Sequence, residues 1–516
     1  MQAQYIAVVD VGTSKICCHI VDQQACVIGK SIIKIETIHP NRGWMEINPE
    51  VLWQQFIRSV QASVKDAKIS IEDIAAIGMS TQRNSITIWN KDTGKTLYNF
   101  ITWQDTRVSE DVHSWNASLR FRVARIGGKL GHFVTRHNFF KAASVLTFTT
   151  QQASVTIRLL WLLNNVAEAR NLIRTGTLLY GCIETWLIWK MTGGKKHITD
   201  YSCASATGLF NPYMTGWSTF VTTLVGIPLS IFPKVVDSSG PLAVTDNEVF
   251  GKAIPITAII ADQQASLFGG LCFDKGDMKC TLGTGTFLTI NCGSKPYASL
   301  AGLYPLIGWK LKDQSIVYVA EGNASSTGSV IDWLCSFAEI GSPQEIVDLV
   351  STVDDTNGVY FVPAFNGLQA PYKDWKASPL LIGFGFETTK AHVARAILES
   401  FAYRVRQIYE TFLVESNISI NSIKLDGGVT KSSLVAQLIS DVLKQELHHS
   451  TATNASILGA IYLTGLGIGI WKDLDDIKKL KANTILYCPS VDKCNKYDKS
   501  YDTWKKSVKR SLVWYS

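Results

Sequence analysis

The sequence has few charged residues and no long uninterrupted apolar run. Charged residues make up 18% of its 516 residues and hydrophobic residues 46%, which excludes an intrinsically disordered chain. A membrane-spanning helix needs roughly 18 consecutive apolar residues. The most apolar segment, LLYGCIETWLIWKM, is interrupted by Glu184. We therefore expect a globular protein with a large core and no membrane span.

Cysteine pairs with the spacing of a metal site or a disulfide framework are also absent. The 11 cysteines are scattered, and no two of them form a CxxC motif. This pattern excludes a structural zinc site and a disulfide scaffold, and it favours a reducing compartment. The N-terminal segment MQAQYIAVVDVG has no signal-peptide pattern, so we expect a cytoplasmic protein.

The charge balance does not indicate a nucleic-acid partner. The chain carries 50 Lys and Arg against 43 Asp and Glu, a formal net charge of +7. A basic cluster near the C-terminus, WKKSVKR, has no interleaved aromatic residues and is typical of a solvated helix face. We therefore expect no nucleic acid as a partner.

One local design occurs twice, about half a chain apart. In YIAVVDVGTSKICCHIVD, residues 5 to 22, an apolar run ends at Asp10 and a small-residue turn leads into a second run. In MKCTLGTGTFLTINCG, residues 278 to 293, the turn contains Thr284 and Gly285. Both patterns predict β-hairpins. The repetition predicts two domains of similar design.

Small-residue turns of this kind suit a polyphosphate, because they expose backbone N–H groups and hydroxyls without bulk. Asp10 would repel phosphate unless a cation lay between them, so the pattern implies Mg²⁺, held partly through water. The alternative is a pair of ordinary hairpins with glycine-containing turns.

A third segment, IKLDGGVTKSS, reads as a strand, a glycine turn and a helix from Leu434 to Leu447, another anion-binding arrangement. A further helix is expected within residues 392–413. Strands and helices mixed along the chain indicate an α/β fold.

Three polar segments could bind a hydroxylated substrate. Asp262 follows the apolar run PITAIIA, where a carboxylate could accept a proton from a substrate hydroxyl or could simply cap the next helix. The segments STQRNS (80–85) and WQDTR (103–107) combine Trp, Gln, Asp and Arg, which suits polyol recognition. Taken alone, Trp103 is better interpreted as a core residue.

Taken in order, these segments resemble the FGGY family of carbohydrate kinases, within it the glycerol kinases, and among those the branch called glycerol kinase five. The similarity runs from about Ile6 to Trp471. The segments that carry it are DVGTS, STQR, WQDTR, TWLIWKMTGGKKHITDYSCASATGLF, ADQQASLFG, LGTGTFL, VPAFNGLQAPY and LDGGVT.

The resemblance implies an actin-like ATPase fold with two ribonuclease-H-like domains around a cleft. We expect an N-terminal substrate domain (1–270), a C-terminal ATP domain (271–490) and a helical tail (491–516). Asp262 would be the general base and Asp10 would organise Mg²⁺. The remaining implied site residues are Arg83, Asn84, Trp103, Gln263 and Phe287 for the polyol, and Gly12, Thr13, Ser14, Thr284, Gly285, Gly328, Gly428 and Ser432 for ATP.

Three positions depart from the glycerol kinase pattern. Asn84 stands where a Glu is usual, Ala153 where a Tyr is expected, and Cys17 where a basic residue is usual. These differences weaken the expectation of glycerol as substrate more than that of kinase chemistry. We expect ATP-dependent phosphorylation of glycerol or a closely related small polyol. A kinase for another sugar or polyol and a nucleotide-binding regulator with decayed activity stay open, as does a homo-oligomer.

Overall fold

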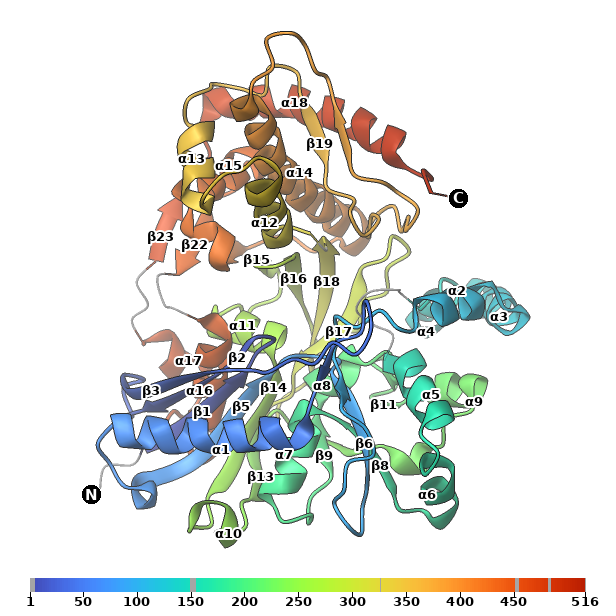
Figure 1. Cartoon of the computed structure of the whole chain (residues 1–516), viewed down its shortest axis with the longest axis vertical. Helices are drawn as coiled ribbons and strands as arrows, with labels where there is room; N and C mark the ends of the chain where they lie inside the picture. The colour runs from blue at the N-terminus through green and yellow to red at the C-terminus, as the bar shows by residue number, and fades with distance from the viewer. Residues whose placement is uncertain (1–4, 149–154, 325, 451–453, 481–483, 516) are drawn as a thin grey trace.

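A computed structural model of the chain describes residues 5–148, 155–324, 326–450, 454–480 and 484–515. Its two large sheets lie one above the other in Figure 1, each with helices against it. In the order of its strands, the first sheet contains β13 (Ser239–Val244), β14 (Pro255–Ala261), β5 (Ile74–Thr81), β1 (Tyr5–Val11), β2 (Lys15–Val21) and β3 (Val27–Lys34). The second sheet contains β17 (Tyr304–Trp309), β18 (Val317–Ala324), β16 (Thr286–Gly293), β15 (Asp277–Leu282), β21 (Ser422–Asp426), β22 (Leu447–Ser450) and β23 (Thr484–Tyr487).

The two sheets share one pattern of pairing. In the first, β1 pairs antiparallel with β2 and parallel with β5, which pairs parallel with β14. In the second, β15 pairs antiparallel with β16 and parallel with β21, which pairs parallel with β22. The two predicted hairpins and the α/β fold are therefore confirmed, and the repeated sequence design corresponds to a repeated sheet design.

Smaller strands and the helices complete the chain. The remaining strands are β4 (Glu46–Ile47), β6 (Ile86–Asn90), β7 (Phe100–Ile101) and β8 (Leu178–Cys182), which form a third sheet, and β9 (Ile198–Asp200), β10 (Phe210–Asn211), β11 (Gly216–Trp217), β12 (Lys234–Val236), β19 (Tyr360–Val362) and β20 (Leu380–Ile382). The helices are α1 (Pro49–Asp66), α2 (Ser109–Ala117), α3 (Leu119–Thr135), α4 (Asn138–Ala143), α5 (Val155–Asn165), α6 (Ala169–Thr175), α7 (Ile183–Met191), α8 (Tyr201–Ala206), α9 (Thr219–Val225), α10 (Asn247–Phe250), α11 (Asp262–Gly269), α12 (Gly328–Phe337), α13 (Pro343–Val350), α14 (Lys390–Ser416), α15 (Ser433–Leu443), α16 (Ala455–Ile468), α17 (Leu474–Lys478) and α18 (Val491–Ser511).

The helix predicted within residues 392–413 is confirmed as α14, which packs its apolar stripe on the second sheet. The helix predicted from Leu434 to Leu447 is wrong at its end. Lys444 adopts a left-handed backbone conformation (φ 58°) that terminates α15 at Leu443, and Leu447 begins β22 instead. The apolar spacing continues across this turn because Leu447 is buried as well, although it lies in a strand.

The chain returns to the first sheet near its C-terminal end. Helix α16 follows the second sheet in sequence, yet Ala460, Ile461 and Leu463 belong to a core that includes Ile6 and Val8 of β1. Helix α18 then packs on the second sheet's side, where the Trp504 indole donates a hydrogen bond to the carbonyl of Phe361. The division of the sequence at residue 270 stays a prediction. No helix within the described ranges is long and apolar enough to cross a membrane.

Candidate active site

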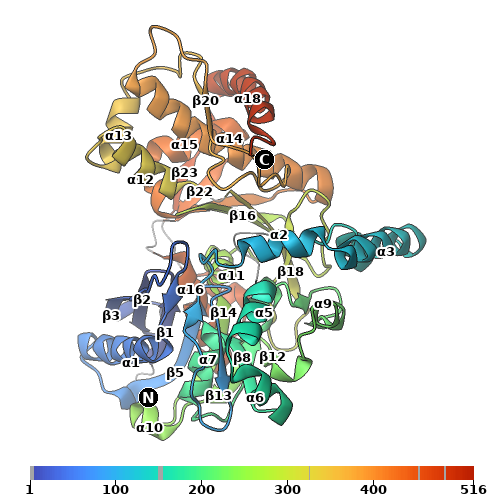
Figure 2. The same ribbon diagram turned by 45° about the vertical axis from the view of Figure 1, so that its right-hand side comes forward.

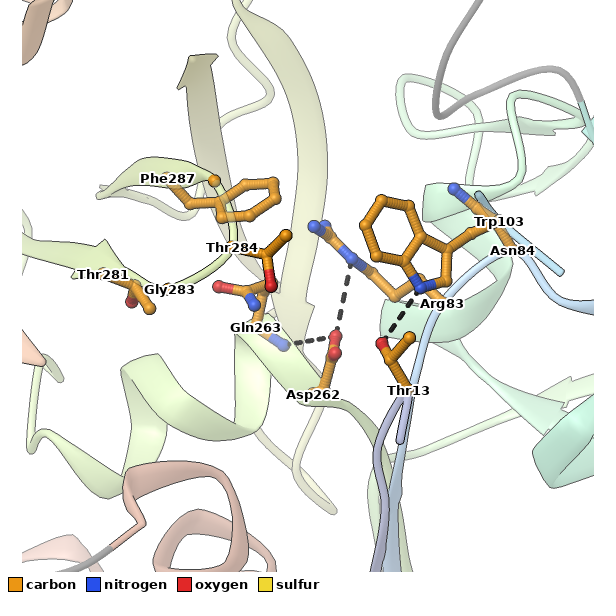
Figure 3. A pocket seen from close by; sticks show the side chains of 11 residues that line it. Thr13, Arg83, Asn84, Trp103, Asp262, Gln263, Thr281, Gly283, Thr284 and Phe287 are labelled. Carbon is orange, nitrogen blue, oxygen red and sulfur yellow. Dashed lines mark hydrogen bonds and ion pairs between the residues drawn. The ribbon is translucent and has the colours of Figure 1, made fainter. Parts of the chain in front are cut away.

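A cavity of about 160 Å³ lies where the two hairpins face each other, beside the beginning of α11 (Figure 3). The turn after β5 and the segment after β7 complete its walls. The predicted residues that line it are Thr13, Arg83, Asn84, Trp103, Asp262, Gln263, Thr284, Gly285 and Phe287, and Thr281 and Gly283 join them. The structure thus brings together side chains from five separate segments of the sequence.

Asp262 is the first residue of α11 and directly follows the buried strand β14. The capping interpretation does not hold, because Ala261 is the N-cap and no side chain caps the helix. The Asp262 carboxylate instead accepts a hydrogen bond from the backbone N–H of Gln263 at 2.7 Å. Although 26% of its side chain is exposed, burial raises the pKa of Asp262 to about 6, against the lowering effect of Arg83. Such a carboxyl group is suited to accept a proton near neutral pH.

Arg83 connects the two halves of the cavity. Its guanidinium donates two hydrogen bonds to the Glu321 carboxylate on β18, at 3.0 and 3.1 Å, and its Nε lies 3.7 Å from Asp262 Oδ1. Only the two contacts with Glu321 are hydrogen bonds, because 3.7 Å is too long for one, so they leave three of the five guanidinium N–H donors for a ligand. The Glu321 side chain is 5% exposed and fixes the guanidinium in place. The sequence analysis did not identify Glu321. Its signal in the sequence is that an acidic residue interrupts the mostly apolar segment 317–324.

Trp103 lies between the cavity and the first hairpin. Its indole N–H donates a hydrogen bond to Thr13 Oγ1 at 3.1 Å, which orients the ring beside the guanidinium of Arg83 (Figure 3). The rest of the WQDTR segment does not line the cavity. Asp105 and Arg107 form an ion pair at 2.8 Å with each other, and the Arg107 guanidinium stacks 3.9 Å from the Trp44 ring centroid. Within the WQDTR segment, Trp103 is therefore the residue placed to contact a polyol. Asp105 and Arg107 instead stabilise the loop that carries it.

Asp10 is the penultimate residue of β1 and is 6% exposed. Its Oδ2 accepts hydrogen bonds from Asn454 Nδ2 at 3.1 Å and from Ser456 Oγ at 3.0 Å, at the beginning of α16. Within the described residues its buried Oδ1 has no partner, and burial raises the pKa of Asp10 above its ordinary value. An unsatisfied carboxylate oxygen fits Mg²⁺ bound through one carboxylate and water. No cluster of three or more His, Cys, Asp or Glu that could cage a metal occurs in the described part of the chain.

The tip of the second hairpin is fastened to the start of α12. The backbone N–H of Gly328 donates to the Gly283 carbonyl at 3.0 Å, and that of Thr327 donates to the Thr284 carbonyl at 3.0 Å. A Cβ atom on Gly328 would lie only 2.7 Å from the Gly283 carbonyl oxygen. Glycine at position 328 therefore allows the close approach that holds Thr284 and Gly285 at the cavity wall. Gly328 itself is not among the lining residues.

The third predicted anion site lies beside the same hairpin. Among the described residues, a Cβ atom on Gly428 would meet no atom within 4 Å, and the buried Ser432 hydroxyl, in the turn before α15, has no hydrogen-bond partner. Nearby, Asp426 accepts from Lys279 Nζ at 2.9 Å and from Ser266 Oγ at 3.1 Å. Burial alone would raise the pKa of Asp426, but Lys279 holds it below its usual value. Open space and an unsatisfied hydroxyl fit a nucleotide that enters here.

The first hairpin places its predicted residues at the turn. The Gly12 carbonyl accepts a hydrogen bond from Gln82 Nε2 at 2.9 Å, and the Ser14 carbonyl accepts from the Ile35 N–H at 2.9 Å. Gly12 and Ser14 therefore brace the turn, and Thr13 alone reaches the cavity wall. On the second hairpin, the Phe287 ring lies 5.9 Å from the Arg83 guanidinium.

Two of the three departures from the glycerol kinase pattern can be placed. Cys17 is 5% exposed within an apolar core, where burial raises the pKa of its thiol, so it cannot replace a basic phosphate contact. Asn84 lines the cavity with φ 64°, and its carbonyl accepts a hydrogen bond from the buried Arg158 at 2.8 Å. Ala153 lies outside the described residues.

Comparisons with known proteins agree with this arrangement. Glycerol kinase 5 of Bos taurus is 44% identical over 514 residues, which cover 100% of this chain and 97% of that protein. Glycerol kinase 2 of Thermotoga maritima is 35% identical over 512 residues, 99% of each chain. The crystal structure of Plasmodium falciparum glycerol kinase with ADP superposes with a TM-score of 0.88 at 30% identity and covers 99% of both chains.

The domain models of one family account for most of the chain. The N-terminal domain of the FGGY family of carbohydrate kinases matches residues 5–269, and its C-terminal domain matches residues 278–468. The two sheets of one design, with a cavity between them, are the architecture of an actin-like ATPase. The chain therefore belongs to the FGGY family of carbohydrate kinases and has the actin-like ATPase fold of that family.

Proposed function

We propose that this protein transfers the γ-phosphoryl group of ATP to a primary hydroxyl of glycerol, giving glycerol 3-phosphate and ADP. The observation that carries the proposal is the cavity in which Asp262, with a pKa of about 6, faces Arg83, Trp103 and the Thr284–Gly285 turn. A cavity of about 160 Å³ suits a small polyol. The glycerol kinases among its relatives support the same substrate.

In the proposed reaction, the substrate hydroxyl gives its proton to Asp262 while its oxygen attacks the γ-phosphorus. The bond from that phosphorus to the leaving ADP oxygen breaks, and ADP carries away the electron pair. Arg83 and Gln263 orient the polyol, Trp103 and Phe287 cover its C–H faces, and the two hairpin turns hold the phosphates. Mg²⁺ held near Asp10 would neutralise phosphate charge, as in other phosphoryl transfers. The chain's contribution is positioning and charge stabilisation.

We propose that the two sheets close around the bound substrates and exclude water, and that the Arg83–Glu321 ion pair helps to hold them together. The Arg83–Glu321 pair bridges the β5 turn and β18, and thus joins the two sheets at the cavity. Closure of the sheets around bound substrates would expel water, which otherwise could accept the phosphoryl group wastefully. The proposed domain division at residue 270 would place the hinge between α11 and β15.

A panel of substrates at saturating Mg-ATP tests the function. We expect ADP release with glycerol, and rates with pentuloses or larger polyols lower by about tenfold or more, because a methylene or hydroxyl mismatched to a pocket costs that much. The measurement is a coupled ADP assay together with identification of the phosphorylated product.

The panel also decides between the alternatives. A pentulose or larger polyol that is phosphorylated faster than glycerol would indicate a kinase for another sugar or polyol. The amide of Asn84 in the cavity wall is the observation that supports this alternative. ATP binding in calorimetry with no turnover on any panel member would favour a regulator with decayed activity, for which the buried Cys17 is the supporting observation.

The pH profile tests the role of Asp262 separately. The base must be deprotonated, and its pKa of about 6 instead of 3.8 moves the loss of activity to a higher pH. We expect kcat/KM for glycerol to be level near neutral pH and to fall about tenfold per pH unit below about 6, because only the carboxylate accepts a proton. Initial rates between roughly pH 5 and 8 measure this; a level profile throughout would remove Asp262 as the titrating base.

The proposal also includes a cellular compartment and the molecules that the enzyme binds. All eleven cysteines are free in the structure, and most are buried. This arrangement supports a reducing compartment, and we propose the cytoplasm. The partner we propose is the small polyol, with ATP and Mg²⁺ as co-substrate and cofactor.

A further inference from the structure

Helix α3 presents an apolar stripe to solvent on a part of the molecule that projects from the body. Figures 1 and 2 both show α3 at the outer end of the α2–α4 segment, away from the two sheets. Its large apolar residues recur at intervals of four or three positions and then end in an adjacent pair. They are Leu119, Val123, Ile126, Leu130, Phe133 and Val134, each 59–79% exposed. This spacing puts them on one face of the helix.

The folded protein does not need this stripe for its own packing. The buried side of α3 consists of Phe121 and Gly128, and an added Cβ on Gly128 would lie 2.5 Å from the Ser144 backbone nitrogen beside α4. Successive residues rotate by 100° around a helix, so the exposed stripe lies opposite this buried side. Monomeric proteins rarely expose contiguous apolar patches, and such patches mark interaction sites.

The charged side chains on α3 and in the segment that follows it are all of one sign. Arg120, Arg122 and Lys129 on α3 and Arg136 just after it are exposed. No Asp or Glu occurs anywhere between residues 112 and 167. Among the described ion pairs, none involves a cation of α3. An uncompensated basic helix with an apolar face is typical of segments that lie in the interface of an anionic membrane.

We propose that α3 binds the surface of an anionic phospholipid bilayer, with its apolar stripe among the acyl chains and its cations at the headgroups. The charge argument separates this partner from a second copy of the chain. Two α3 helices packed stripe to stripe would bring Arg122 and Lys129 of each copy close together without an acidic residue to compensate. Anionic headgroups supply the missing negative charge. The protein would then be a peripheral membrane enzyme without a spanning helix.

Flotation of the full-length protein with vesicles tests the proposal. We expect binding to phosphatidylcholine vesicles that contain about 30% phosphatidylserine, weak binding to phosphatidylcholine alone, and loss of binding at high salt. Each basic residue near such a surface is worth about a factor of five. The double variant Arg122→Glu, Lys129→Glu should therefore bind at least about 30-fold more weakly, and Ile126→Asn, Phe133→Asn should bind poorly even at low salt.

Matched controls and a second measurement keep the result decisive. The double variant Lys91→Glu, Lys95→Glu changes the same charge at exposed positions away from α3 and should bind like the wild type. All of these variants should keep their kinase turnover, because the altered side chains are exposed and distant from the cavity. Equal binding to neutral and anionic vesicles, no vesicle binding at all, or a dimer in light scattering that Phe133→Asn dissociates would overturn the proposal.

Discussion

Asp262→Asn should lose about two to four orders of magnitude in kcat while it still binds ATP. The amide keeps the size of the carboxylate, so its oxygen can still accept the hydrogen bond from the Gln263 N–H. It cannot take a proton from the substrate hydroxyl, and it removes the charge that faces Arg83 at 3.7 Å. A coupled ADP assay measures turnover, and calorimetry with Mg-ATP measures nucleotide binding.

The control for this substitution is Asp246→Asn, which also removes a carboxylate at the start of a short helix. Asp246 pairs with the exposed Lys195 at 2.7 Å on another part of the surface, and it does not line the cavity. Its turnover should equal that of the wild type. Turnover close to wild type in Asp262→Asn would rule out Asp262 as the base. Loss of both turnover and ATP binding would instead indicate a damaged fold, which circular dichroism would reveal.

The sequence predicted those parts of the site whose residues follow one another along the chain. Asp10 with its turn, Asp262 after β14, and Thr284 with Gly285 each stand where a strand gives way to a turn or helix. Apolar runs mark the strands and small residues mark the turns, so these local signals suffice. The same logic explains the confirmed hairpins and α14.

Contacts between distant segments could not be predicted in this way. Glu321 is 238 positions from Arg83, and nothing in the periodicity of either segment links them. Asn454 and Ser456 reach Asp10 only because α16 returns to the first sheet. The WQDTR segment shows the converse, because only Trp103 of its residues lines the cavity. Its residues are adjacent in sequence, but the turn of the backbone sends Arg107 toward Trp44 and away from the cavity.

The substitution with the largest expected effect on stability lies where α11 crosses α16. The two helices touch through their backbones, since a Cβ atom on Gly459 would lie 1.9 Å from the Ala265 carbonyl oxygen. On the other side of the contact, a Cβ on Gly269 would lie 2.1 Å from the Ala455 carbonyl oxygen. Helix α11 begins with Asp262 and α16 begins beside Asp10, so this crossing sets the positions of both carboxylates.

We therefore expect Gly459→Ala to destabilise the protein by about 3 kcal/mol, because the helices must move apart to admit the methyl group. The first thermal transition should then fall by roughly 6–12 °C. The matched control is Gly127→Ala on α3, where an added Cβ meets no atom of the described residues within 4 Å. Alanine there should raise stability by up to about 1 kcal/mol, since it is the better helix former. Scanning calorimetry of both variants tests this prediction. A melting temperature of Gly459→Ala equal to or higher than that of the wild type would show that α11 and α16 can accommodate the methyl group without moving apart. A lower melting temperature should come with a lower kcat, because separating the helices displaces Asp262 from the substrate hydroxyl.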